Sequence, residues 1–219
     1  MAWDDAAEGP RPAVLVVHAY GGRGAYECDR AEELAKLGYV GFAVDIYGKG
    51  VLAQEPAKCE RLMQPFIEDR RLLLRRLELG LNTARSQPEC QADRVAAIGY
   101  CFGGLCVLDM ARANLGLAGV ASFHGLFDPP GDGTGEPIAA KVLVLHGWED
   151  AMVPPESVLA VTKELTARRA DWQIHAYGGT YHAFTNPNAD DLSRSVKYDA
   201  AADRRSWQAL VDFLGELFP

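Results

Sequence analysis

The sequence predicts an α/β fold in which a doubly wound, mainly parallel sheet is flanked by helices. Solid apolar runs of strand length recur along the chain, and segments with helical periodicity separate most of them. Because these runs do not alternate polar and apolar residues, they indicate strands covered on both faces, as in a parallel sheet. The expected strands are 13–17, 39–45, 94–98, 118–123, 141–147 and 172–177.

The composition of the chain fits one globular domain. Of its 219 residues 48% are hydrophobic and 24% charged, which is enough to bury a substantial core. We expect a short N-terminal lead over residues 1–12 and a single domain over 13–219. A net charge of -8 argues against nucleic acid or an anionic membrane as a partner, and no apolar run approaches membrane-span length. The acidic start Met1–Asp5 is unlike a signal peptide, so a cytoplasmic protein is expected.

A glycine-rich loop, His18 to Gly24, follows the first predicted strand. Loops at the carboxyl ends of parallel strands form the sites of such sheets, so this loop is expected to reach the site. The backbone N–H of Ala19 is a candidate oxyanion donor there. The alternative is that the glycines only turn the chain into the next helix. A phosphate loop is disfavoured, because the segment lacks the G-K-[ST] ending and the G-x-G-x-x-G spacing.

The helical segments are identified by their apolar stripes and their ends. Residues 27–37 are expected to form a helix that stops at Gly38, with a loop over 46–56 after the next strand. Residues 59–85 are expected to form one long helical region with a bend near Pro65, and its apolar stripe is interpreted as core. The remaining predictions are helices over 105–112, 156–168 and 201–218 and a turn-rich loop over 128–137.

The segment Gly99–Gly104 joins a predicted strand to a predicted helix and carries a cysteine near its centre. Its G-x-C-x-G pattern is similar to a nucleophile elbow, a sharp turn whose flanking glycines let neighbouring backbone approach closely. We expect Cys101 to point into solvent, where the helix dipole favours a thiolate and the N–H of Phe102 stabilises an oxyanion. The alternative is a buried structural cysteine at a glycine-rich helix start.

Asp150 and His182 lie in the loops after the last two predicted strands. With Cys101 they give the order nucleophile, acid, histidine. In that arrangement His182 takes the thiol proton and later protonates the leaving group, while Asp150 orients the imidazole and stabilises its charge. Glutaminase-type cysteine hydrolases place the acid two residues after the histidine, where this chain has Phe184. A helix cap is the alternative role for Asp150.

The other histidine and cysteine positions indicate structure rather than chemistry. His124 ends a predicted strand on the loop side of the sheet, and a hydrogen-bonded structural role is favoured over contact with a ligand. No cysteine pair or Cys/His cluster has metal-ligand spacing, so no metal is expected. The remaining cysteines, expected to be free thiols, are Cys28, Cys59, Cys90 and Cys106.

In these segments the chain resembles the dienelactone hydrolase family. The matching segments are Val14–His18, Gly38–Gly48, Ala97–Gly104, His146–Pro154 and Gly179–Phe184. The resemblance implies an α/β-hydrolase fold without a large cap domain and a triad of Cys101, His182 and Asp150. It also implies cleavage of a small-molecule carboxylic ester or lactone through a thioester acyl-enzyme, without cofactor or metal. A monomer or small homo-oligomer is expected.

Two positions depart from the family pattern. Members often carry a glutamate that holds the resting thiol directly after the position of His18, and Ala19 stands there. Dienelactone hydrolases proper carry an arginine for the substrate carboxylate four residues after the catalytic histidine, and Asn186 stands there. Neutral substrates are therefore expected, and the alternative function is a catalytically idle member that binds a small ligand or partner. The few residues before Ala13 predict a sheet that is short at one edge.

Overall fold

A computed structural model describes residues 1–6, 9–131 and 135–219 of the chain. Its main sheet has six strands in the order β2-β1-β3-β4-β5-β6, and every neighbouring pair is parallel. The strands are β1 (Arg11–Val17), β2 (Val40–Val44), β3 (Cys90–Tyr100), β4 (Gly119–Phe123), β5 (Lys141–Gly147) and β6 (Trp172–Tyr177). The predicted α/β architecture with a parallel sheet is confirmed.

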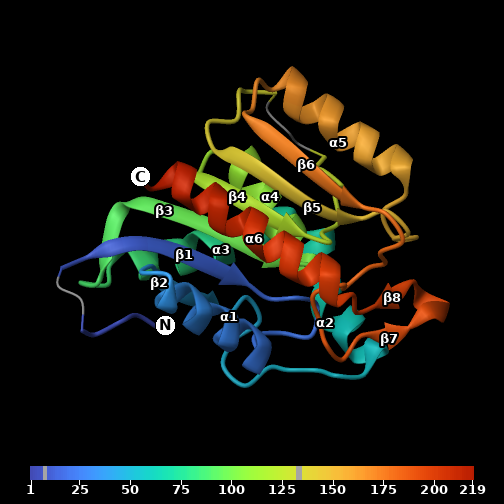
Figure 1. The fold of residues 1–219 in the computed structure, drawn as a ribbon, viewed down its shortest axis with the longest axis horizontal. Helices are drawn as coiled ribbons and strands as arrows, with labels where there is room; N and C mark the ends of the chain where they lie inside the picture. Colours follow the sequence, from blue (N-terminus) through green and yellow to red (C-terminus); the bar gives the residue numbers. More distant parts are fainter. Residues whose placement is uncertain (7–8, 132–134) are drawn as a thin grey trace.

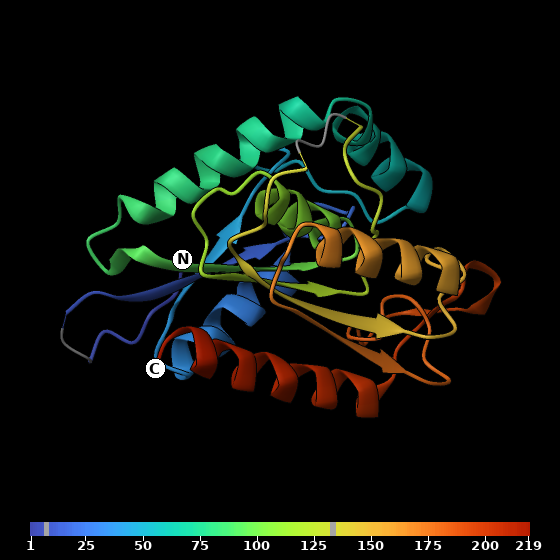
Figure 2. The same ribbon diagram turned by 90° about the horizontal axis from the view of Figure 1, so that it is seen from above.

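Helices cover both faces of this sheet (Figures 1 and 2). Figure 2 shows α1 and α6 below the sheet and α2, α3, α4 and α5 above it. The helices are α1 (Ala25–Lys36), α2 (Pro56–Glu68), α3 (Arg70–Arg85), α4 (Phe102–Arg112), α5 (Pro155–Ala167) and α6 (Ala200–Leu217). Beyond β6 the chain also forms a small two-stranded hairpin, β7 (Asp190–Asp191) and β8 (Val196–Lys197), around the 3-10 turn Leu192–Arg194.

The solid apolar strands divide their side chains between two cores. In β1, Val14 and Val16 pack with α1 and α6, whereas Leu15 and Val17 pack with α2 to α5. All four side chains are fully buried. A strand covered on both faces needs apolar residues at every position, which explains why the sequence shows runs instead of alternation.

The long helical region differs from its prediction. The structure has two helices that meet at Asp69, whose backbone (φ -118°, ψ 85°) leaves the helical region. The Asp69 carboxylate accepts the N–H of Leu72 at 2.8 Å and so caps the start of α3. Pro65 lies inside the last turn of α2, where its carbonyl still accepts the N–H of Asp69 at 3.0 Å. The helical region therefore breaks at the capping residue Asp69 and not at Pro65.

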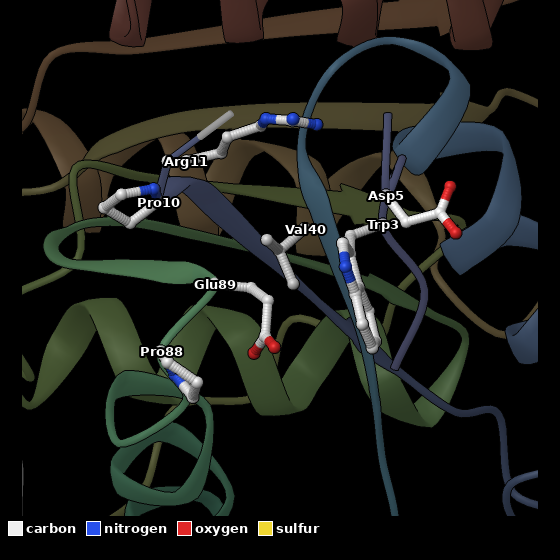
Figure 3. Close-up of a pocket in the computed structure, with 8 residues that line it drawn as sticks. Trp3, Asp5, Pro10, Arg11, Val40, Pro88 and Glu89 are labelled. Carbon is white, nitrogen blue, oxygen red and sulfur yellow. The ribbon is translucent and has the colours of Figure 1, made fainter. Parts of the chain in front are cut away.

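The N-terminal lead takes part in the sheet edge. Ala2 forms an isolated antiparallel bridge with Gly41 of the edge strand β2, with N–H to carbonyl distances of 2.8 and 2.9 Å. A pocket of about 260 Å³ lies beside this lead and is lined by Trp3, Val40 and Glu89, among others (Figure 3). These residues flank the amino ends of the strands, so the pocket is at the opposite end of the sheet from the predicted site.

All six parallel strands point their carboxyl ends toward the same side of the molecule, the side that also carries β7 and β8 (Figure 1). The loops after β3, β5 and β6 carry Cys101, Asp150 and His182, so the sheet itself gathers the three predicted side chains. In the described part of the chain no helix is long and apolar enough to cross a membrane.

Candidate active site

Cys101 occupies a sharp turn between β3 and α4. Its backbone has φ 54° and ψ -113°, a conformation that L-residues rarely adopt. A Cβ on Gly99 would overlap the carbonyl of Gly103, and a Cβ on Gly103 would overlap the carbonyl of Val17. The two glycines thus let β3, α4 and β1 meet at the turn, as the G-x-C-x-G pattern predicts.

Asp150 and His182 form a hydrogen-bonded pair beside this turn. The distance from His182 Nδ1 to Asp150 Oδ2 is 2.7 Å, and both residues are buried. The second carboxylate oxygen, Asp150 Oδ1, accepts the N–H of Met152 at 2.9 Å, which fixes the orientation of the carboxylate. His182 Nε2 is buried and has no hydrogen-bond partner among the described residues, which leaves this nitrogen available to the thiol. The neighbouring Glu149 is exposed.

The charges of the thiol and the imidazole stabilise one another. Burial opposes ionisation of Cys101, but the positive charge of the nearby His182 and the N–H of Phe102 together lower the pKa of the thiol. Burial likewise opposes protonation of His182, yet Cys101 and Asp150 raise the pKa of the imidazole to about 10. The arrangement therefore favours a thiolate paired with an imidazolium.

The exposure of Cys101 corrects one expectation. The residue is half-buried and does not point freely into solvent, because the buried ring of His182 lies beside the sulfur. The sequence pattern around Cys101 says nothing about the loop after β6. The half-buried state of Cys101, which depends on His182 in that loop, was therefore not predicted. The other four cysteines in the structure are free thiols, as expected, and three of them are buried.

The two predicted oxyanion donors differ in their surroundings. Phe102 is the first residue of α4, and its backbone N–H faces the Cys101 sulfur. The carbonyl of Ala19 accepts a hydrogen bond from Nδ1 of the buried His18 ring at 2.7 Å, and His18 Nε2 accepts the N–H of Ile46 at 3.2 Å. These contacts anchor the loop after β1, and the use of the Ala19 N–H as an oxyanion donor stays a prediction.

A buried carboxylate, Glu27, was missed by the sequence analysis. It lies in the first turn of α1, where Oε2 accepts the N–H of Gly24 at 2.8 Å. Burial raises the pKa of Glu27, while the N–H groups of Gly24 and Ala19 work against this rise. The three-residue spacing between Gly24 and Glu27 is typical of a capping box and was the available signal.

His124 is a hydrogen-bonded structural histidine, as the sequence analysis favoured. Its Nε2 lies 2.8 Å from Thr185 Oγ1, which also accepts the hydroxyl of Tyr26 at 2.8 Å. The ring packs edge-on against His182, with centroids 5.3 Å apart. Burial and the nearby His182 hold the pKa of His124 well below its usual range, so this ring stays neutral beside the charged one.

Asn186 and Arg194, in the segment of chain after His182, both have partners of their own. Asn186 Oδ1 accepts the N–H of Asn188 at 3.0 Å and so belongs to its own loop. Arg194 contacts Glu60 at 3.2 Å and the hydroxyl of Tyr20 at 3.4 Å. In the ranges 1–6, 9–131 and 135–219 no group of three or more His, Cys, Asp or Glu side chains is placed to hold a metal ion.

Comparison with known proteins places these features in a family. The model of the dienelactone hydrolase family matches residues 2–218. A Synechocystis protein named "Putative carboxymethylenebutenolidase" is 30% identical over 219 residues, which cover 92% of this chain and 85% of that protein. A Bradyrhizobium protein named "Probable 2-oxo-3-(5-oxofuran-2-ylidene)propanoate lactonase" is 28% identical over 189 residues, covering 80% of this chain and 74% of that protein.

Among solved structures, a dienelactone hydrolase-like promiscuous phosphotriesterase from metagenomic libraries superimposes with a TM-score of 0.94. It is 36% identical to this chain, and the match covers 99% of this chain and 91% of that one. A dienelactone hydrolase structure from Anabaena variabilis, at 19% identity and a TM-score of 0.66, shares the fold. The match to the first structure extends over nearly the whole chain, including the segments that carry Cys101, Asp150 and His182.

Proposed function

Because this chain belongs to the dienelactone hydrolase family, an ester- and lactone-cleaving group, we propose that it hydrolyses a small-molecule carboxylic ester or lactone through Cys101, His182 and Asp150. One observation carries the proposal. A cysteine in a left-handed elbow lies beside a buried imidazole whose other nitrogen is 2.7 Å from a carboxylate. The lowered pKa of Cys101 supports its use as the nucleophile.

In the proposed first half-reaction the Cys101 thiolate attacks the carbonyl carbon of the substrate. The carbonyl oxygen becomes an oxyanion, which the backbone N–H of Phe102, with that of Ala19, stabilises. When the tetrahedral intermediate collapses, the carbon–oxygen bond to the leaving group breaks and His182 delivers its Nε2 proton to that oxygen. The product is an alcohol, or the opened hydroxyl end of a lactone, and a thioester on Cys101.

In the second half-reaction His182 acts as a base toward water. Its neutral Nε2 accepts a proton from a water molecule, and the resulting hydroxide attacks the thioester carbon. The second tetrahedral intermediate expels the thiolate and releases the carboxylic acid. Asp150 keeps the proton of the imidazole on Nδ1 throughout, so that Nε2 points to the reacting atoms in both halves.

The experiment is a pre-steady-state assay with p-nitrophenyl acetate, followed by a panel of neutral and anionic esters and lactones. A burst of p-nitrophenol equal to the enzyme concentration, abolished by iodoacetamide, is expected for a thioester acyl-enzyme. The catalytically idle alternative predicts neither burst nor turnover. Since the similar solved structure is named for phosphotriesters, paraoxon is included in the panel as a separate class of substrate.

A further inference from the structure

Ser195 lies in the small hairpin beyond β6, between the 3-10 turn and β8. It is buried, and its backbone is in the left-handed region, with φ 59° and ψ 32°. This conformation is unfavourable for a residue with a side chain and persists where surrounding contacts hold it. Ser195 contacts the backbone of His182 and the two residues that flank Asp150, Glu149 and Ala151.

The Ser195 hydroxyl bonds to the backbone on both sides of Asp150. It donates its hydrogen to the carbonyl oxygen of Glu149, at 2.8 Å, and accepts the N–H of Ala151, at 3.0 Å. One side chain thus satisfies the peptide groups immediately before and after the acid. The Ser195 hydroxyl therefore helps to hold the backbone of Asp150, whose carboxylate is also oriented by the N–H of Met152.

The backbone of Ser195 holds the histidine. Its carbonyl oxygen accepts the N–H of His182 at 2.9 Å, and the N–H of Lys197, two residues on, donates to the His182 carbonyl at 3.1 Å. These bonds attach the loop after β6 to β8. A single residue therefore joins the loop that carries the acid to the loop that carries the histidine.

We propose that Ser195 is a positioning residue that sets the distance between Asp150 and His182 and so the charge of the Cys101 thiol. The inference rests on the proposed function, because Ser195 acts through the positions of Asp150 and His182. If the hydroxyl is removed, the peptide groups of Glu149 and Ala151 lose their partner and the acid loop relaxes. A longer Asp150 to His182 contact stabilises the imidazolium less, and the thiolate beside it becomes less favourable.

The test uses Ser195→Gly and Ser195→Ala, with Ser193→Ala as the matched control. Glycine adopts the left-handed backbone without strain, so Ser195→Gly removes the hydroxymethyl side chain without straining the backbone and folds even where Ser195→Ala does not. Ser193 lies in the same hairpin, is exposed, and donates its hydroxyl hydrogen to Asp191 Oδ1 at 2.6 Å. Its replacement by alanine should leave the kinetics unchanged.

For Ser195→Gly we expect kcat to fall roughly 10- to 100-fold with KM nearly unchanged, because misplacement of the acid affects the reaction and not binding. The midpoint pH for alkylation of Cys101 by iodoacetamide should move upward, a shift that a change in folding stability alone does not produce. Combined with Asp150→Asn, the Ser195→Gly change should add little, because both act through the same carboxylate.

Wild-type kcat and an unshifted alkylation midpoint in Ser195→Gly would overturn the inference. It would also be overturned if the kcat loss in the double variant with Asp150→Asn equalled the product of the two single losses. Such results leave the proposed function in place if turnover still depends on Cys101. Turnover that survives Cys101→Ala would instead remove the proposed function itself, so the two failures are distinguishable.

Discussion

The α-carbon of Gly103 lies against the backbone carbonyl of Val17, so close that a methyl group on Gly103 would overlap the oxygen. Gly103→Ala is therefore expected to destabilise the protein by about 1 to 3 kcal/mol, the usual cost of overpacking a rigid interior. The displaced backbone also carries the turn at Cys101, so activity should fall as well. Chemical denaturation with an activity assay measures both effects.

Gly215 supplies the control for this substitution. It lies in α6, and a methyl group there would meet no other part of the described protein. Gly215→Ala should be neutral or stabilise the protein by up to about 1 kcal/mol, because alanine loses less backbone entropy in a helix. Equal stability losses in the two variants would show that the Gly103 contact is not tight.

Replacement of the nucleophile should separate activity from folding. Cys101→Ala is expected to reduce turnover at least about 1000-fold, because no other group in the site supplies the thioester. The unfolding free energy should change by no more than about 1 kcal/mol, since the side chain is only half-buried. Cys106→Ala, one turn further along α4 and fully buried, should keep its activity. Retained turnover in Cys101→Ala contradicts the assignment of the nucleophile.

The two adjacent carboxylates give a matched pair of variants. Asp150→Asn should lower kcat by several orders of magnitude, because an amide at this position holds the wrong tautomer of His182. Glu149→Gln should have nearly wild-type kinetics, since that side chain is exposed. Steady-state kinetics on a neutral ester compares the two variants. A larger loss of kcat in Glu149→Gln than in Asp150→Asn would assign the role of the acid to Glu149.

The pH dependence of labelling tests the resting charge of the thiol. An unperturbed thiol, with a pKa of about 8.5, is only about 3% ionised at pH 7. The pKa of Cys101 is lowered, so its thiolate persists below that range and is lost only as the pH falls through the lowered value. Iodoacetamide should therefore label Cys101 rapidly well below pH 8.5, as mass spectrometry can follow. A labelling midpoint near 8.5 in the wild-type protein contradicts this prediction.

Substrate charge should affect the rate. Asn186 offers no cation, and Arg194 is paired with Glu60, so neutral esters and lactones are expected to react faster than carboxylate-bearing ones. One missing charge-assisted pair costs about 1.5 to 3 kcal/mol, roughly 10- to 100-fold in kcat/KM. Glu60→Gln releases Arg194 from its ion pair and should raise kcat/KM for anionic substrates several-fold while leaving neutral ones unchanged. A wild-type preference for an anionic lactone would show that a cation already serves the site.

The residues that the sequence identified share one property. Cys101, Asp150 and His182 each lie in the loop that follows a predicted strand, and the carboxyl ends of parallel strands meet at one edge. Local pattern and chain order were therefore sufficient to bring them together. The role of Ser195 was not predicted, because it lies in a hairpin of two-residue strands, which are too short to show a periodic pattern. The half-buried state of Cys101 was not predicted either, because it depends on contact with the segment around His182, about eighty residues further along the chain.

The break in the long helical region shows a second limit. Proline is the stronger signal for a helix break, yet Pro65 is tolerated in the last turn of α2. The break falls at Asp69 because its side chain can cap the next helix, at Leu72. Two competing local signals four residues apart were present, and the helix breaks at the capping residue Asp69.

The bridge between Ala2 and Gly41 also bears on how the protein behaves at high concentration. An edge strand with unpaired peptide groups is a template onto which a strand from another molecule can add, which begins aggregation. At Gly41 both the N–H and the carbonyl are already bonded to Ala2. Since β2 has only five residues, this single bridge interrupts the edge near its start and leaves only a short stretch to which a foreign strand can attach.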